Sequence, residues 1–198
     1  FIRQPITVNA PGARVALRGL TLKGTGASTA ITLTAAEALS IEDTTVDGLG
    51  VGLDIANAAP SSVAITKTVF QGNLTGVRDV GPASNRVSMS ASRFEGNGTG
   101  LSASGGTHTV SECSFAANTV ALSVSSGVAE ISQTQLWSNG TGLSVLSGGT
   151  ARIGRSHAFG NMTGLSAAGG STLASFGSNV IRGNGTNVDG TVTTVPEQ

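Results

Sequence analysis

The stretch Ser138-Asn139-Gly140-Thr141-Gly142-Leu143-Ser144-Val145 decides the fold, because related stretches return at nearly constant spacing along the chain. Each one combines a turn-forming residue, most often Asn, with an aliphatic residue four positions later. The related stretches are Gly72–Val77, Gly96–Leu101, Asn118–Leu122, Asn161–Leu165 and Asn184–Val188. Internal repeats of about 20 to 50 residues are the sequence signature of solenoids and related arrays. The whole chain can therefore be aligned on this stretch.

Alignment on the repeat yields three apolar columns, whose members lie one repeat apart and are expected to face a common core. The first column advances by 21 to 24 residues and contains Leu17, Ile41, Ile65, Met89, Val110, Ile131, Ile153 and Phe176. The second contains Leu22, Val46, Phe70, Phe94, Phe115, Leu136, Ala158 and Ile181. The third contains Ile31, Leu53, Val77, Leu101, Leu122, Leu143, Leu165 and Val188. Apolar and polar residues alternate around each column, which is typical of short β-strands.

Three short strands in each repeat predict an all-β fold, a single-stranded right-handed parallel β-helix of about eight coils. Left-handed β-helices are built from hexapeptides in coils of about 18 residues, so the coils of 21 to 24 residues favour the right-handed form. We expect residues 1–198 to form one such domain without an N-terminal cap. Both of its ends are then open strand edges, at which self-association is expected.

Composition narrows the range of functions. The chain has 198 residues, of which 38% are hydrophobic, and this is enough for a sizeable core. Only 11% are charged and the formal net charge is zero, so no electrostatic field favours nucleic acid or an anionic membrane. No apolar run approaches the length of about 18 residues that a membrane span requires. A single cysteine, Cys113, excludes an internal disulfide.

One column of turn positions becomes all Asn from the third coil onward, with Asn73, Asn97, Asn118, Asn139, Asn161 and Asn184. We expect this corner to need the left-handed backbone conformation, which Asn tolerates better than other non-glycine residues. Stacked side-chain amides can also form hydrogen bonds from coil to coil, as a structural ladder. All except Asn118 begin an Asn-x-Thr sequon, so we interpret the column as structural rather than as a set of glycosylation sites.

Three residues break the apolar pattern near the expected core. Asp79 falls at an inward position, and because Gly81-Pro82 follows, we predict a bulge that places Val80 inward instead; a buried functional acid is the alternative. His108 aligns with apolar residues of other coils, and since no second His or acid is expected there, we predict a structural role. Cys113 aligns with Ser and Thr residues and is predicted to be buried rather than reactive.

The stretches Asn97–Ser102, Asn139–Ser144 and Ser147–Ile153 resemble those of right-handed β-helix repeat proteins of the pectate-lyase-like superfamily. They are most similar to a group of secreted bacterial β-helix proteins, and the resemblance covers about residues 6 to 192. It implies the fold and an extracellular or cell-surface location. It also raises the alternative of a polysaccharide lyase or glycoside hydrolase, or the degenerate remnant of one.

Carboxylates do not gather as such an enzyme requires. A calcium-dependent lyase needs several converging carboxylates, and a hydrolase needs two across the scissile bond. The densest acidic group, formed by Glu42, Asp43, Asp47 and Asp54, does not continue as carboxylates on neighbouring coils, and we interpret it as a solvated rim. The sequence therefore indicates no catalytic residue, metal or cofactor.

Aromatic residues mark the most distinctive surface. Trp137 and Phe159 share an outward column on adjacent coils, Gln135 and His157 form the neighbouring column, and Arg155 and Arg182 lie nearby. Exposed aromatic rings beside hydrogen-bonding groups suit the apolar face of a sugar, and they equally suit a contact with another protein or subunit. Packing beneath a neighbouring loop is the third interpretation.

The first hypothesis for function is therefore a non-catalytic extracellular β-helix, with a structural or binding role, that recognises carbohydrate or another protein. The candidate binding residues are Trp137, Phe159, His157, Gln135 and Arg155. Self-association through this surface or through the open ends is a further expectation. An ice-binding or mineral-binding face ranks last, because the outward columns are mixed in composition.

Overall fold

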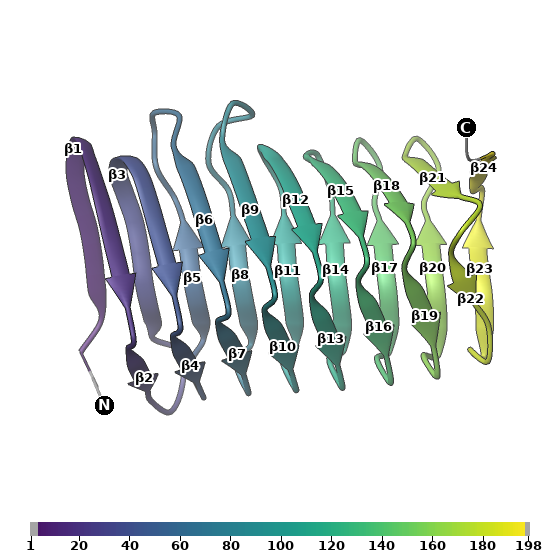
Figure 1. The fold of residues 1–198 in the computed structure, drawn as a ribbon, viewed down its shortest axis with the longest axis horizontal. Helices are drawn as coiled ribbons and strands as arrows, with labels where there is room; N and C mark the ends of the chain where they lie inside the picture. The colour runs from purple at the N-terminus through teal and green to yellow at the C-terminus, as the bar shows by residue number, and fades with distance from the viewer. Residues whose placement is uncertain (1–3, 197–198) are drawn as a thin grey trace.

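The chain forms 24 β-strands and no helix within residues 4–196, the residues that the computed structural model describes (Figure 1). The strands wind into a right-handed parallel β-helix of about nine turns, close to the eight expected. The N-terminal and C-terminal coils lie at opposite ends of the long axis in Figure 1. Every strand pairing in this part of the chain is parallel and joins one coil to the next, for example Leu143 beside Leu165.

Three walls of strands enclose the core, and the chain passes from wall I to wall II to wall III in each coil. Wall I contains β5 (Val51–Ile55), β8 (Thr75–Asp79), β11 (Thr99–Ala103), β14 (Val120–Val124), β17 (Thr141–Val145), β20 (Thr163–Ala167) and β23 (Thr186–Gly190). Wall II contains β6 (Ser62–Thr66), β9 (Arg86–Ser90), β12 (Thr107–Ser111), β15 (Val128–Ser132), β18 (Thr150–Gly154), β21 (Thr172–Phe176) and β24 (Thr193–Val195). Wall III contains β2 (Thr21–Lys23), β4 (Thr45–Asp47), β7 (Val69–Gln71), β10 (Arg93–Glu95), β13 (Ser114–Ala116), β16 (Gln135–Trp137), β19 (His157–Phe159) and β22 (Val180–Ile181).

Two long strands begin the solenoid. β1 (Ile6–Arg18) and β3 (Thr29–Glu42) each run through wall I and wall II, so these two walls form one 16-stranded sheet joined through β3. Wall III is a separate 8-stranded sheet. In β3, the short Ala-rich segment Ala35–Leu39 is extended rather than helical.

The core lies inside the three walls and is built from the apolar columns. Phe70, Phe94 and Phe115 are fully buried on wall III, with ring centroids 5.2 and 4.4 Å apart between successive coils. One member of the first column is wrong, because Ser175 rather than Phe176 pairs with Ile153 and faces inward. The Ser175 hydroxyl accepts a hydrogen bond from Asn179 Nδ2 at 2.9 Å, which satisfies this polar side chain. Phe176 is therefore on the outer face of wall II.

A polar column turns the chain from wall II to wall III. Its members Thr44, Thr68, Ser92, Cys113, Thr134 and Ser156 each donate a hydrogen bond to the carbonyl two residues earlier, at 2.8 to 3.2 Å. The residue before each member, such as Arg155 (φ 50°), has a left-handed backbone. Cys113 is 2% exposed, which confirms its predicted burial. Burial raises the pKa of the Cys113 thiol to about 11, against smaller opposing effects of backbone hydrogen bonds.

The Asn column turns the chain from wall III to wall I, but not for the reason expected from backbone conformation. The left-handed residue at this corner is the one before Asn, such as Ala117 (φ 54°) or Ser138 (φ 55°), so that expectation is wrong. The side-chain oxygen of Asn118 accepts bonds from the backbone N and Nδ2 of Asn97 at 2.9 and 3.0 Å. Its Nδ2 donates to Asn139 Oδ1 and to a backbone carbonyl, both at 3.0 Å. The Asn residues thus satisfy buried backbone groups.

A buried polar cluster replaces the bulge predicted at Asp79, and that prediction is wrong. Asp79 keeps its inward place between Ile55 and Ala103 and is fully buried, whereas Val80 is 52% exposed. Asp79 Oδ2 lies 3.0 Å from Nε2 of the fully buried His108, so the expectation that no acid shares the site of His108 is also wrong. Neither of these two atoms has a hydrogen-bond partner within residues 4–196, so each depends on the electrostatic contact with the other.

The same cluster fixes two corners between walls I and II. Asn57 and Asn85 exchange reciprocal side-chain hydrogen bonds of 2.8 and 3.0 Å. Asp79 Oδ1 accepts bonds from Gly81 N at 2.9 Å and from Asn85 Nδ2 at 3.2 Å. These corners follow β5 and β8 and project further from the solenoid than those of later coils (Figure 1). The buried amides and carboxylate therefore hold the longest connections in place.

Candidate ligand-binding surfaces

Trp137 and Phe159 lie side by side on the outer face of wall III, at the ends of β16 and β19. Strand register pairs them directly, and their ring planes are 8° from parallel with centroids 6.4 Å apart. Trp137 is 38% exposed and Phe159 is 40% exposed. Gln135 and His157 pair at the other end of the same two strands and are also exposed. These four residues are named the aromatic patch.

The preceding coil fixes the indole of Trp137. Its Nε1 donates a hydrogen bond to Ser114 Oγ at 3.2 Å, and Ala116, which pairs with Trp137 in the sheet, is only 5% exposed. The small side chain of Ala116 leaves space for the indole to pack on the sheet, and the Ser114 hydroxyl accepts its hydrogen bond. The ring is held in place while more than a third of the residue remains open to solvent, so it offers a rigid apolar surface.

Two hollows flank the paired rings along the rod. The first has a volume of about 290 Å³ and is lined by Arg93, Glu95, Ser114 and Trp137, among others. The second has a volume of about 570 Å³ and is lined mainly by His157, Phe159, Val180 and Arg182. Each ring therefore borders a shallow space that also contains an Arg side chain.

Arg155 lies apart from these hollows. Arg155 occupies the corner between walls II and III, and it lines a different hollow, which lies on wall II. Arg182 is the cation that lines the hollow beside Phe159. Of the five residues predicted to form one binding site, the structure brings Trp137, Phe159, Gln135 and His157 together on wall III and places Arg155 at the neighbouring site.

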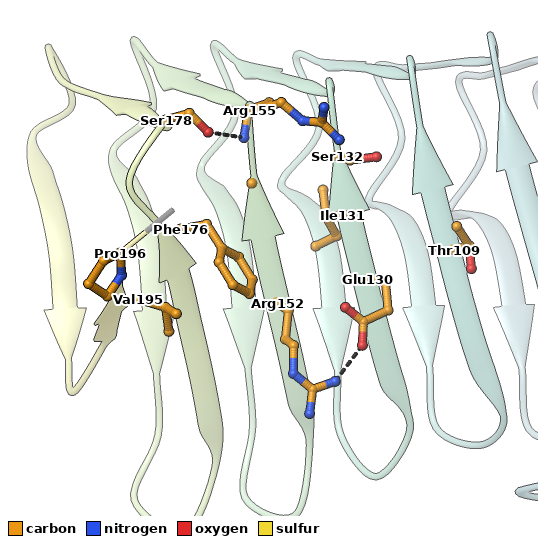
Figure 2. Close-up of a pocket in the computed structure, with 11 residues that line it drawn as sticks. Thr109, Glu130, Ile131, Ser132, Arg152, Arg155, Phe176, Ser178, Val195 and Pro196 are labelled. Atoms are coloured by element: carbon orange, nitrogen blue, oxygen red, sulfur yellow. Dashed lines mark hydrogen bonds and ion pairs between the residues drawn. The ribbon is translucent and has the colours of Figure 1, made fainter. Parts of the chain in front are cut away.

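The hollow on wall II has a volume of about 580 Å³ and is named the Phe176 groove. Figure 2 shows Phe176 beside Val195 and Pro196, with Arg152 and Glu130 along one side and Arg155 along the other. The lining residues are Thr109, Glu130, Ile131, Ser132, Arg152, Gly154, Arg155, Phe176, Ser178, Val195 and Pro196. It forms without long loops, from the outward residues of β12 to β21 and the returning strand β24.

The sequence pattern does not directly indicate this groove, because the hydrophobicity of Phe176 predicts a core position. Two signals could have found it. Ser175 rather than Phe176 keeps the spacing of 22 residues from Ile153 that the preceding coil shows between Ile131 and Ile153. Small outward residues, Ser132 and Gly154, also precede the large Phe176 in one outward column.

The acidic residues are mostly engaged with cations. Asp54 is 8% exposed and accepts two hydrogen bonds from the Arg78 guanidinium at 2.9 and 2.8 Å, so it is not part of a solvated rim. The hydrogen bond to Asp54 raises the pKa of Arg78. Glu42 and Asp47 also contact cations, at 3.0 and 3.1 Å. Within the described residues, no group of three or more His, Cys, Asp or Glu side chains is placed to hold a metal ion.

Among residues 4–196, no helix is long and apolar enough to cross a membrane.

Stacked parallel coils with three walls and polar corner columns define the class of protein, a parallel β-solenoid. The chain belongs to the family described as the right handed beta helix region, whose model matches residues 8–184. This match is consistent with membership of the pectate-lyase-like superfamily, which the repeated sequence stretches indicate. A comparison with curated proteins and a comparison with solved structures each found no match.

Proposed function

We propose that this β-helix is a non-catalytic extracellular binding domain, and that the aromatic patch on wall III binds an extended carbohydrate. The observation that carries the proposal is the pair of exposed, nearly parallel rings of Trp137 and Phe159. Sugar rings present apolar C–H faces that pack on aromatic rings, while their hydroxyls need hydrogen-bonding partners. The extracellular location rests on the likeness to secreted β-helix proteins.

The surroundings of the rings support a polymer as the ligand. Hollows lie on both sides of the ring pair along the rod, and they contain Arg93 and Glu95 on one side and Arg182 on the other. Coils follow one another at about 4.8 Å, so a sugar unit about 5 Å long advances by roughly one coil. A chain lying along wall III can therefore place successive units over successive coils.

A lyase or hydrolase is the less favoured alternative. Hydrolases place two carboxylates about 5 to 10 Å apart across the scissile bond. Among the described residues 4–196 that line the Phe176 groove, Glu130 is the one carboxylate, and it contacts Arg152. In the hollow beside Trp137, Glu95 is the one carboxylate that the described part of the chain contributes, and it contacts Arg93 at 2.9 Å. These arrangements support binding more than catalysis.

Affinity gel electrophoresis with soluble polysaccharides tests the proposal. We expect at least one polysaccharide to retard the protein, and the double variant Trp137→Ala with Phe159→Ala to lose about tenfold or more in affinity. Leu74→Ala is the matched control, because it removes an exposed apolar side chain, 68% exposed, from a distant coil.

Two results would overturn this proposal. One is equal retardation of the double variant and the Leu74→Ala control. The other is the absence of any polysaccharide binding together with a concentration-dependent dimer that the double variant abolishes. The second result would assign the aromatic patch to self-association instead.

A further inference from the structure

Three members of the Asn column are followed by Gly, and an Asn-Gly pair is chemically labile. The pairs are Asn97-Gly98, Asn139-Gly140 and Asn184-Gly185. Asn is a thermolabile residue, and Gly hinders attack of its own backbone N on the preceding side chain least, because it has no Cβ. The first and third pairs lie in the same tetrapeptide, Gly-Asn-Gly-Thr, at residues 96–99 and 183–186. The two Asn residues therefore have similar intrinsic reactivity, and a difference between them must come from the fold.

The fold protects Asn97 from both neighbouring coils. Asn97 is 2% exposed, and its Nδ2 donates hydrogen bonds to Asn118 Oδ1 at 3.0 Å and to Phe70 O at 2.9 Å. Its Oδ1 accepts bonds from the backbone N and Nδ2 of Asn73 at 3.0 and 3.1 Å. The backbone N of Gly98 donates to Asn73 O at 2.9 Å. Attack of Gly98 N on the Asn97 side chain therefore requires these bonds to open inside the solenoid.

Asn184 forms the same kinds of hydrogen bond in a more open corner. Its Nδ2 donates to Ala158 O at 2.9 Å and to Asn187 Oδ1 at 3.0 Å. Within residues 4–196, Asn187 of the same corner thus takes the place that an Asn of the following coil has elsewhere. Asn184 is half-buried, and both Gly185 and Asn187 are exposed. Opening of this corner therefore costs less free energy than opening at Asn97.

We propose that Asn184 is a site of spontaneous deamidation in the folded protein, and that this modification loosens one border of the aromatic patch. The Gly185 backbone N gives its proton to hydroxide and attacks Asn184 Cγ. The new N–Cγ bond closes a cyclic imide, the Cγ–Nδ2 bond breaks, and Nδ2 takes up a proton from water and leaves as ammonia. A water molecule then opens the imide at either carbonyl, which leaves Asp or isoaspartate at position 184.

The product replaces a hydrogen-bond donor with an acceptor. A carboxylate oxygen in the place of Asn184 Nδ2 faces Ala158 O and Asn187 Oδ1, two oxygen atoms that repel it. Isoaspartate also lengthens the main chain by one atom. The segment just before Asn184 contains β22 and Arg182, which border the hollow beside Phe159. Loosening of this segment changes the hollow, and its effect on ligand binding rests on the proposed function.

Peptide mapping by mass spectrometry tests the chemistry on the full chain, after incubation at mildly alkaline pH. In the folded protein, we expect Asn184 to deamidate at least about tenfold faster than Asn97 and Asn139, because its corner opens more easily. In the same chain unfolded in guanidinium, we expect the three rates to become similar. The two buried Asn-Gly pairs are thus matched controls within the same molecule.

Hydrogen exchange tests the effect on the fold without any ligand. The variant Asn184→Asp, which carries one of the two products, is expected to exchange faster than the unmodified protein over residues 180–183. Asn9→Asp is the control, because it adds the same charge at an exposed residue of β1, and its exchange over residues 180–183 should be unchanged. Neither readout depends on carbohydrate, so failure of the proposed function would be seen separately. With a polysaccharide that retards the protein in gels, Asn184→Asp is expected to bind more weakly than Asn9→Asp.

Three outcomes would overturn the inference. Equal rates at Asn97 and Asn184 in the folded protein would show that the fold does not select the site. Reaction of Asn184 only after unfolding would show that its corner is protected. Unchanged exchange over residues 180–183 in Asn184→Asp would remove the link between this modification and the hollow.

Discussion

Removing either member of the buried Asp79–His108 pair is expected to destabilise the protein strongly. The Asp79 Oδ2 and His108 Nε2 atoms are 3.0 Å apart, both side chains are fully buried, and neither atom has another partner in residues 4–196. Removing one member of a buried pair leaves the other unpaired at a cost of about 3 to 5 kcal/mol. We therefore expect Asp79→Ala and His108→Ala each to lower the free energy of unfolding by about 4 kcal/mol.

The double variant distinguishes a coupled pair from two separate losses. Asp79→Ala with His108→Ala removes both polar groups at once, so its cost is expected to fall short of the sum of the single variants by about 2 kcal/mol or more. Replacing both with Val, which suits the apolar columns around them, is expected to cost less than either single Ala variant. Val80→Ala is the control and is expected to cost less than about 0.5 kcal/mol, because Val80 is 52% exposed.

Guanidinium denaturation provides the measurement, followed by far-ultraviolet circular dichroism and by the fluorescence of Trp137, the single Trp of the chain. Coincident transitions from the two probes permit the comparison of free energies. Additive costs of the two Ala variants, within about 0.5 kcal/mol, would show that the two side chains do not interact. A large cost for Val80→Ala would place Val80 in the core and refute the account of this corner.

Two further predictions concern the polar columns. Asn118→Ala is expected to lower the free energy of unfolding by about 4 kcal/mol, because it leaves buried backbone groups of Asn97 and Phe94 without partners. Asn187 lies outside the column and accepts a hydrogen bond from the exposed last member, Asn184, so Asn187→Ala should cost only about 1 kcal/mol by the same denaturation assay. The Cys113 thiol should react with a disulfide reagent at pH 8 only after unfolding, since burial raises its pKa from 9.0 to about 11. Rapid labelling of Cys113 in the folded protein would contradict this prediction. Because the pKa of the thiol is raised on folding, its contribution to stability is complete below pH 9.0 and is lost as the pH rises through 11. Cys113→Ser should therefore remove this part of the pH dependence of stability.

The sequence predicted the winding of the chain well, because the apolar columns follow simple periodic rules. Strands in a parallel β-helix must keep their inward residues in register from coil to coil, because a shift of one residue would turn all inward side chains of the strand outward. The pairing of Ile131 with Ile153 and of Leu143 with Leu165 could therefore be predicted from spacing alone. The hydrophobicity of Phe176 predicts an inward position, and this prediction is wrong because the coil keeps its length and places Ser175 inward.

Contacts between different walls were harder to predict. Asp79 belongs to wall I, and His108 belongs to wall II of the following coil. Each column of the sequence alignment contains residues of one wall, so it does not predict a contact between residues of two walls. Each is an exception to the apolar pattern in the sequence, but only the fold shows that the two side chains are in contact. The left-handed backbone conformation at the corner of the Asn column is also hard to predict, because it is adopted by the residue before each Asn, which is Gly, Ala or Ser.

The candidate binding surfaces also contain features that the sequence predicts and features that only the fold shows. The outward columns were sufficient to predict that Trp137 stands beside Phe159 and Gln135 beside His157. Arg155 was expected next to them, but its corner position assigns it to the groove on wall II. That groove depends on the returning strand β24, whose position no column predicts.

The fluorescence of Trp137 tests the binding proposal most directly, because the chain has one Trp and no Tyr. Titration with a polysaccharide that retards the protein in gels is expected to shift the emission to shorter wavelength, as a sugar ring displaces water from the exposed indole. The shift should saturate at the affinity measured in gels, and Phe159→Ala should weaken it. Tight polysaccharide binding with unchanged Trp137 emission would place the ligand elsewhere and contradict the assignment of carbohydrate binding to the aromatic patch.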